Sequence, residues 1–200
     1  MKPMSQFFAM LSRMKYINRW GLMRNTRPET LSEHSLEVAF LAHALGVLRN
    51  KRFSGSVNPE RLALLSLFHD VPEIITGDLP TPVKYYNESI RGVYGEIEEN
   101  ACGFLLSMLP GDLIEEYAPL LSPTEEDREL LPLLKAADKL SALIKCLEEK
   151  SMGNRDFEQA EASTRRALEE MHLPEADCFL HEFLPAYLLT LDEQKQGGNF

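Results

Sequence analysis

Two adjacent ionisable side chains, His69 and Asp70, close an apolar stretch that begins at Ala63. Burying such groups costs free energy unless they are paired with a charge or coordinated to a metal. A helix that simply ends here in water is the simpler explanation, and it is preferred for an isolated pair. The pair therefore points to chemistry only if further ligand-type side chains converge on it.

A second polar group, Asp138, lies within an apolar helical pattern. Leu134 and Ala142 are four residues away on either side, so helical spacing places the carboxylate on their face. Buried carboxylates are rare and need a partner charge or a metal. Lys135 and Lys139 are the alternative partners, and an ion pair with either lysine would make this aspartate a structural residue.

The third group is His34, which lies in the first turn of a predicted helix, three residues before Glu37. This position borders the inward face, where a single histidine is more often a satisfied core residue than a ligand. Taken together, however, the two imidazoles and two carboxylates form a borderline-to-hard donor set that suits a divalent metal such as Co, Mn, Fe, Zn or Ni. Four ligands leave positions open for water and substrate, as in a catalytic site.

Helices must position these groups, because helical periodicity is common along the chain and strand signals are weak. The first helix is predicted over about residues 5–17. A longer helix begins at a capping box formed by Thr30 and Glu33, with Ser32 as a competing cap, and runs to about Arg49. Its predicted buried side consists of Leu36, Phe40, Ala44 and Val47.

The next helix starts at Asn58 and Pro59, because asparagine suits the cap and proline the first turn, and it ends at His69. Residues 76–82 are predicted to form a loop. Pro132 either kinks a later helix or marks its true start. Further helices are expected at about residues 85–109, 112–121, 125–150, 155–172 and 175–193. The sequence thus predicts a single all-α domain of six to nine helices over residues 1–193, followed by a flexible tail over 194–200.

The composition describes an acidic globular protein of 200 residues with a net charge of −10. That charge argues against nucleic acid or an anionic membrane as a partner. Residues 1–52 carry nine basic and three acidic side chains, which indicates either a local anion site or an uneven solvated surface, and composition alone favours the surface. Three cysteines without CxxC spacing favour a reducing compartment, and the short N-terminal apolar cluster is neither a signal nor a membrane span. We expect a cytoplasmic protein.

The order His34, His69-Asp70, Asp138 resembles the signature of the HD-domain metal-dependent phosphohydrolases. The resemblance narrows further, because several segments are similar to those of the bacterial 5′-deoxynucleotidases of the YfbR type. These segments are Leu11-Ser12-Arg13, Ile17-Asn18-Arg19-Trp20, Leu22-Met23-Arg24-Asn25, Ser32-Glu33-His34-Ser35-Leu36, Thr76 to Tyr85 and Lys145-Cys146-Leu147-Glu148-Glu149. The similarity covers almost the whole chain and implies an HD-domain helical bundle and a homodimer.

The resemblance also implies roles for individual residues. The implied ligands of one divalent cation, cobalt, manganese or a similar ion, are His34, His69, Asp70 and Asp138. The implied catalytic residues are Arg19, Glu73 and Asp78. The implied substrate-binding residues are Arg19, Trp20, His34, Asp70, Asp78, Leu79, Pro80, Thr81 and Asp138. One departure is local: Pro72 precedes Glu73 where relatives have small residues, and this proline affects how the carboxylate is aimed.

The chemistry of these residue types agrees with a metal-dependent hydrolysis of deoxyribonucleoside 5′-monophosphates. A metal lowers the pKa of bound water from about 15.7 toward 7, which supplies hydroxide to attack the phosphorus. An arginine fork such as that of Arg19 stabilises charge on the phosphoryl oxygens, and Arg24 and Arg27 are weaker candidates. Asp78 or Glu73 could move protons between water and the leaving group.

Trp20 is the only tryptophan, and a residue of this type usually packs in a core or at a helix boundary. Because it follows Arg19 in a predicted loop, it could instead form an apolar wall against C2′ of a deoxyribose. The remaining histidines, His43, His172 and His181, belong to no motif and are expected to be structural or surface residues.

Two alternatives remain open at this point. Another HD phosphohydrolase would act on nucleoside triphosphates, cyclic nucleotides or (p)ppGpp, and it would release different products. A catalytically inactive helical scaffold would keep the fold without turnover, and the intact set of four ligand-type residues argues against it.

Overall fold

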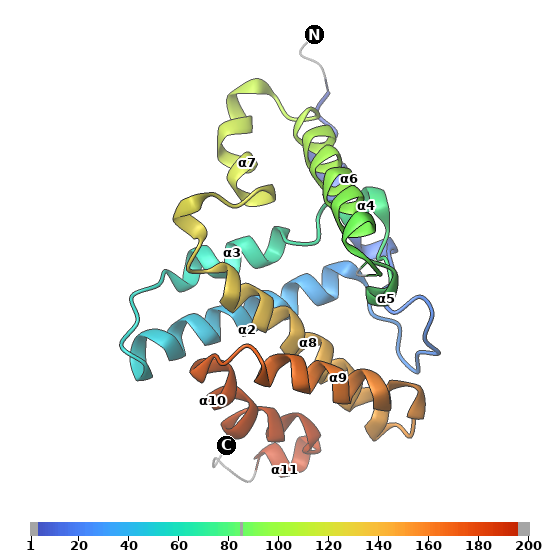
Figure 1. Cartoon of the computed structure of the whole chain (residues 1–200), viewed down its shortest axis with the longest axis vertical. Coiled ribbons are helices and arrows are strands. Elements are labelled where there is room, and N and C mark those ends of the chain that lie inside the picture. Colours follow the sequence, from blue (N-terminus) through green and yellow to red (C-terminus); the bar gives the residue numbers. More distant parts are fainter. Residues whose placement is uncertain (1–3, 85, 196–200) are drawn as a thin grey trace.

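The helix-start signals of the sequence recur in a computed structural model of the chain, which describes residues 4–84 and 86–195 (Figure 1). The Thr30 side chain accepts a hydrogen bond from Glu33 N–H while the Glu33 carboxylate caps Thr30 in return, which confirms the capping box. The Asn58 side chain accepts from Arg61 N–H and Pro59 lies in the first turn, as predicted. These caps fix where the two helices that carry the histidine ligands begin.

The described residues form helices in three groups. The first group is α1 (Phe7–Leu11), the 3-10 helix η1 (Ser12–Tyr16), α2 (Leu31–Arg52) and α3 (Pro59–Phe68). The second is α4 (Glu73–Thr76), α5 (Thr81–Lys84), α6 (Glu88–Leu106), η2 (Gly111–Leu113), α7 (Ile114–Leu121) and η3 (Glu125–Asp127). The third is α8 (Leu131–Ser151), η4 (Arg155–Phe157), α9 (Glu158–Glu169), α10 (Pro174–Glu182), η5 (Leu184–Leu188) and α11 (Leu191–Lys195).

This architecture confirms the all-α prediction. Within residues 4–84 and 86–195, the one β-type pairing is an isolated antiparallel bridge between Asn18 and Thr30. The predicted loop over residues 76–82 contains the start of α5, and Pro132 marks the first turn of α8 rather than a kink. Gln194 and Lys195 belong to α11, so the predicted tail over 194–200 begins too early, and residues 196–200 lie outside the described part.

The predicted buried face of α2 is wrong. Leu36 is 50% exposed and Phe40 is 68% exposed, and Val47 is also exposed. The buried face instead carries Leu31, His34, Val38, Leu41, Ala42, Leu45 and Leu48. Helix α2 carries apolar side chains around its whole circumference, so their spacing in the sequence does not show which face packs against α3 and α8.

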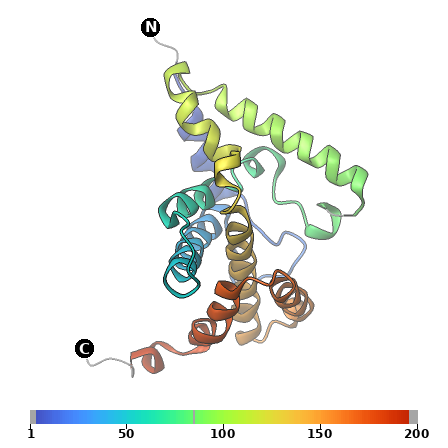
Figure 2. The same cartoon turned by 60° about the vertical axis from the view of Figure 1, so that its left-hand side comes forward.

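Helices α2, α3 and α8 pack together at the centre of the molecule (Figure 1). Figure 2 shows α6 and α7 at one end of this centre and α9 to α11 at the other. One continuous apolar core joins the three helices and includes Leu45, Leu65, Leu133, Leu140 and Ile144. The packing therefore holds three separate chain segments in fixed relation, and the predicted metal ligands lie on all three.

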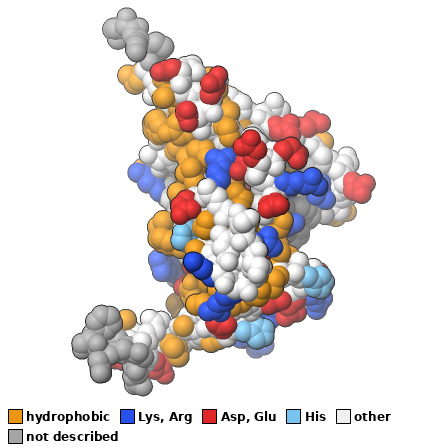
Figure 3. All heavy atoms as spheres, turned by 90° about the vertical axis from the view of Figure 1, so that its left-hand side faces the viewer, with side chains coloured by type: hydrophobic (Ala, Val, Ile, Leu, Met, Phe, Trp, Pro, Cys, Tyr) orange, Lys and Arg blue, Asp and Glu red, His pale blue; other side chains and the backbone are white. Residues whose placement is uncertain are grey.

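One side of the molecule shows how its charged side chains are distributed. On the side shown in Figure 3, acidic and basic side chains are interspersed with apolar ones. The basic surplus of residues 1–52 is therefore not a broad anion-binding face in this view. Among the described residues, no helix combines the length and the apolar character that crossing a membrane requires.

Candidate metal centre and active site

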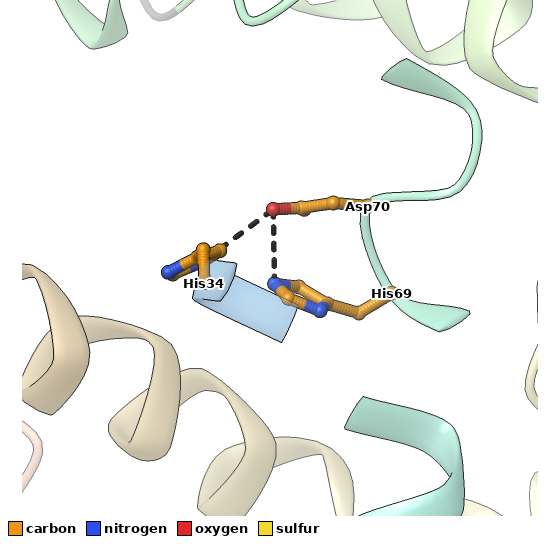
Figure 4. A group of neighbouring side chains, drawn as sticks. All are labelled: His34, His69 and Asp70. Atoms are coloured by element: carbon orange, nitrogen blue, oxygen red, sulfur yellow. Dashed lines mark ion pairs between the residues drawn. The ribbon is translucent and has the colours of Figure 1, made fainter. Parts of the chain in front are cut away.

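The four predicted ligands converge from three helices. His34 lies in the first turn of α2, His69 caps the end of α3 with Asp70 just beyond it, and Asp138 lies within α8. Asp70 Oδ2 is 3.2 Å from His69 Nε2 and 3.4 Å from His34 Nε2, and Figure 4 shows both imidazoles beside this carboxylate. One ligand atom from each of these three residues lies within 4.8 Å of the others.

Asp138 joins this group through His34. Its Oδ1 lies 3.1 Å from His34 Nε2, and its partner in the described part is this imidazole rather than Lys135 or Lys139. The alternative of a purely structural lysine pair therefore does not hold.

The donor atoms are arranged as a cation would require. His69 Nδ1 lies 2.7 Å from the carbonyl oxygen of Ser66, which can only accept, so this nitrogen carries the hydrogen of the neutral ring. Nε2, which faces the Asp70 carboxylate at 3.2 Å, is therefore the nitrogen that would bind a metal once it has lost its proton. The Nε2 atoms of His34 and His69 are both buried and make no well-aligned hydrogen bond in the described part. A metal ion satisfies lone pairs and carboxylates at once, and the residues present fit such an ion.

The charges of the site depend on each other. Burial alone would lower the pKa of His69, but the Asp70 carboxylate beside it raises that pKa to about 9. Burial, together with the nearby Arg19 guanidinium, lowers the pKa of His34. Burial would raise the pKa of Asp70 and of Asp138, but the neighbouring imidazoles hold both pKa values below their ordinary range. The carboxylates are therefore ionised and available to offset the charge of a cation.

Arg19 reaches the edge of this centre from the loop that precedes α2. Its Nη1 lies 2.9 Å from His34 Nδ1 and donates a hydrogen bond to Glu29 Oε2, also over 2.9 Å. The side chain is only 12% exposed. By contrast, the side chains of Arg24 and Arg27 are more than two-thirds exposed and pair with Asp156 and Glu33. Arg19 is thus the predicted arginine that the structure brings to the ligand cluster.

Trp20 is held beside Arg19 by two carboxylates. Its indole Nε1 donates to Glu29 Oε2 over 2.8 Å, and its backbone N–H donates to Asp78 Oδ2 over 3.0 Å. Its φ angle is +61°, a left-handed conformation that is uncommon for a residue other than glycine. Its ring packs against Phe157 at a centroid distance of 5.2 Å. Such strain persists only where the surroundings fix it, and here Asp78 and Glu29 supply the fixing contacts.

Glu29 was missed by sequence reasoning, although it joins Arg19 to Trp20 through one oxygen atom. A signal for it exists in the sequence, because Glu29 is one of only three acidic residues in the basic first 52. An isolated carboxylate among arginines is a natural partner for one of them.

Glu73 lies in the first turn of α4 and is 7% exposed. Pro72 stands in a helical conformation at the start of α4, so it accommodates the turn that buries the Glu73 side chain. Burial, together with the nearby Asp70 and Asp78 carboxylates, raises the pKa of Glu73 to about 8. One carboxyl oxygen of Glu73 is buried without a hydrogen-bond partner in the described part. A carboxyl group in this state holds a proton near neutral pH.

The remaining predicted substrate contacts lie between α4 and α5. Leu79 and Pro80 are half-buried there, and no described contact links either side chain to the ligand cluster. Thr81 begins α5, but its side chain lies outside the described part. The histidines without a motif, His43, His172 and His181, are exposed, as expected of surface residues.

A buried network ties the loop before α2 to α8. The Glu149 carboxylate accepts hydrogen bonds from Thr26 N–H and Oγ1 and from the Asn154 amide. Lys145 forms a close ion pair with Glu149 and donates to the Arg27 carbonyl oxygen. The sequence indicated these two residues only as part of a similar segment, and the structure shows that they anchor the loop that carries Arg19.

A cavity of about 810 Å³ lies away from the ligand cluster, beside α3 and η3. Its arginine, Arg61, is held by both oxygens of Asp127 at 2.8 Å, so the pair leaves no uncompensated charge for a ligand. The chemistry therefore belongs to the convergence of α2, α3 and α8.

Comparisons with known proteins agree with this geometry. A family model described as 5′-deoxynucleotidase YfbR-like matches residues 6–187. The chain is 52% identical over 190 residues to a 5′-deoxynucleotidase of Photorhabdus temperata, covering 95% of this chain and 96% of that one.

Solved structures share the fold. An HD-domain phosphohydrolase of Listeria innocua is 27% identical with a TM-score of 0.77, over 95% of this chain and 92% of that one. A cyanophage S-2L HD phosphohydrolase, described as bound to dA and one catalytic Zn²⁺ ion, is 22% identical with a TM-score of 0.58, over 90% of this chain and 95% of that one. By sequence and fold, this chain belongs to the YfbR-like family of 5′-deoxynucleotidases.

Proposed function

We propose that this protein is a metal-dependent 5′-deoxynucleotidase that hydrolyses deoxyribonucleoside 5′-monophosphates to deoxynucleoside and phosphate. The observation that carries the proposal is the cluster of His34, His69 and Asp70, with an Asp138 oxygen 3.1 Å from His34 Nε2. The names of the relatives, and the dA and Zn²⁺ in the description of the cyanophage structure, support this substrate class and a divalent metal.

The four converging side chains are the proposed ligands of one divalent transition metal, with cobalt or manganese as the expected ion. A bound metal supplies hydroxide at neutral pH and offsets phosphoryl charge. His69 is oriented for this role by its hydrogen bond to the Ser66 carbonyl. The ionised Asp70 and Asp138 carboxylates would offset the charge of the cation.

Arg19 is the proposed phosphate-orienting residue, because its guanidinium already reaches within 2.9 Å of a ligand imidazole. A planar fork can bind two phosphoryl oxygens and stabilise the charge that develops on them. Trp20 is fixed next to it, and its ring is the proposed apolar wall against C2′ of the sugar. Asp78, Leu79, Pro80 and Thr81 complete the proposed substrate contacts, along with His34, Asp70 and Asp138.

Glu73 and Asp78 are the proposed proton carriers. Because Glu73 keeps its proton near neutral pH, it is suited to donate to the departing 5′ oxygen. The Asp78 carboxylate also accepts a hydrogen bond from the Trp20 backbone N–H, so the same group that carries the proton positions the tryptophan proposed to contact the sugar.

The test is phosphate release from matched dAMP and AMP by chelator-treated protein supplied with Co²⁺, Mn²⁺ or Zn²⁺. The proposal predicts metal-dependent release of inorganic phosphate, faster from dAMP than from AMP. Release of pyrophosphate or tripolyphosphate from a triphosphate, with no activity on any monophosphate, would assign the chain to a different HD phosphohydrolase. Failure to bind metal or release phosphate would indicate an inactive scaffold.

We further propose that the protein is a cytoplasmic homodimer whose single domain covers residues 1–193. The continuous core from Phe7 to Leu184 supports one domain. The exposed apolar side chains of Leu36, Phe40 and Val47 on α2 support a subunit contact. Light scattering of the native protein and of Phe40→Glu tests the dimer, because the charged variant should become monomeric.

A further inference from the structure

The Nδ1 atom of His34 has two polar neighbours at hydrogen-bond distance. Arg19 Nη1 lies 2.9 Å away and Ser141 Oγ lies 3.0 Å away, whereas the nearest Glu29 oxygen is at 4.0 Å. His34 itself is fully buried, so water cannot take the place of a neighbour that fails to form a hydrogen bond with Nδ1. Which neighbour pairs with Nδ1 therefore decides which nitrogen of the ring carries the hydrogen.

Metal ligation by His34 Nε2 requires the hydrogen on Nδ1, because a neutral imidazole has one N–H and one lone pair. A guanidinium only donates, so Arg19 cannot pair with an Nδ1–H. The Ser141 hydroxyl can accept that hydrogen, provided that its own hydrogen points elsewhere. It does, because Ser141 Oγ donates to Glu37 Oε2 over 2.5 Å.

We propose that Ser141 and Glu37 are positioning residues that hold His34 in the tautomer that binds the metal. The hydrogen bonds run from His34 Nδ1–H to Ser141 Oγ and from the Ser141 hydroxyl to the Glu37 carboxylate. This inference rests on the proposed function, since it assigns two residues to the support of its metal site. Neither residue is among the proposed metal ligands or substrate contacts.

The two helices place this support with a simple repeat. Ser141 follows Asp138 by three residues on α8, and Glu37 follows His34 by three residues on α2. Each ligand is thus accompanied, one turn further along its own helix, by one member of the positioning pair. Helices α2 and α8 are therefore joined by two polar contacts, one between His34 and Asp138 and one between Glu37 and Ser141.

The Glu37 carboxylate can only accept, so it fixes the direction of both hydrogen bonds, from His34 to Ser141 and from Ser141 to Glu37. An anion that accepts through Ser141 favours donation from His34 and raises the basicity of the ligating nitrogen. His69 receives comparable support from the Ser66 carbonyl alone. Loss of such support around a metal site costs about 10- to 100-fold in metal affinity.

The experiment measures Co²⁺ affinity of chelator-treated protein by competition with a chromophoric chelator, together with the visible spectrum of the bound Co²⁺. Ser141→Ala should weaken Co²⁺ binding by about 10- to 100-fold, and Glu37→Gln should weaken it by a smaller factor. At saturating Co²⁺, both variants should recover phosphate release from dAMP, because the support acts on metal binding. Ser35→Ala is the matched control, since Ser35 is a buried serine next to His34 whose hydroxyl has no described partner.

The proposal is overturned if Ser141→Ala and Glu37→Gln bind Co²⁺ as tightly as the native protein. It is also overturned if Ser35→Ala weakens binding as much as Ser141→Ala does, because the loss would then follow any buried hydroxyl. Circular dichroism checks folding, and if Ser141→Ala does not fold, the half-buried Glu37 variant carries the test. Native protein that binds no Co²⁺ would contradict the proposed function itself, which separates the two failures.

Discussion

Arg19 Nη1 lies 2.9 Å from His34 Nδ1, and because a guanidinium can only donate, a hydrogen bond here is incompatible with ligation of a metal by the opposite nitrogen of the same ring. A ring that accepts at Nδ1 carries its hydrogen on Nε2, where it faces Asp138. A ring that binds metal at Nε2 must turn Arg19 away from Nδ1. A metal bound at Nε2 would therefore release the Arg19 guanidinium from this nitrogen, where it could contact a phosphate.

This relationship predicts the behaviour of Arg19→Ala. The variant should lose about 10²-fold or more in kcat on dAMP, because a donor to the developing phosphoryl charge is removed. Its Co²⁺ affinity should be equal to or higher than that of the native protein, since a competing cation and donor at His34 are gone. Steady-state kinetics and a Co²⁺ titration check both parts. Native turnover in this variant would remove Arg19 from the phosphate site.

Glu29→Gln tests the contact that joins Arg19 to Trp20. A neutral amide keeps the size of the side chain but weakens two hydrogen bonds that now end on one carboxylate oxygen. We expect KM for dAMP to rise and the preference for dAMP over AMP in kcat/KM to fall. Glu60→Gln, an exposed substitution on α3, serves as the control. An unchanged preference would show that Glu29 does not set the position of the sugar wall.

Asp138→Ala separates the metal site from the fold. The Asp138 side chain is 37% exposed and lies at the surface of the core, so its removal leaves no large cavity. We expect bound metal and phosphate release to be lost together, while the far-ultraviolet circular dichroism stays close to native. Elemental analysis after dialysis gives the metal content. A variant that retains both metal and turnover would exclude Asp138 from the ligand set.

The Glu149 network predicts a pH dependence of stability. Burial alone would raise the pKa of Glu149, but the hydrogen bonds from Lys145, Thr26 and Asn154 hold it far below its ordinary 4.5. The unfolded chain then binds more protons than the folded one, so this contribution is present above pH 4.5 and is lost as the pH falls below it.

Glu149→Gln leaves Lys145 buried without its anion, which costs about 3–5 kcal/mol of the free energy of unfolding at neutral pH. Urea unfolding at a series of pH values measures the difference between native and variant protein. That difference should stay constant between pH 7 and about 4.5 and shrink as the pH is lowered further. A constant difference across the series would mean that the ion pair does not contribute through its charge.

The sequence predicted the ligand set because its members are costly to bury and stand in apolar helical surroundings, as His69, Asp70 and Asp138 do. It also predicted the caps at Thr30 and Asn58, which depend on residues three positions apart. Local signals of this kind are independent of the tertiary fold.

What the sequence did not predict depends on distant contacts. The buried face of α2 was assigned wrongly, because Phe40 and Leu41 are both apolar and only packing against α3 and α8 distinguishes them. Glu37 resembles an ordinary surface residue until Ser141, 104 positions later, lies beside it. Glu149 likewise finds its backbone partner at Thr26, 123 positions away.

The most direct test is the position of the metal, by anomalous diffraction from crystals of the Co²⁺-loaded protein. We expect one ion about 2.0–2.3 Å from Nε2 of His34, Nε2 of His69 and a carboxylate oxygen of both Asp70 and Asp138. An anomalous peak elsewhere in the molecule, with these four side chains making no contact to it, would contradict the account.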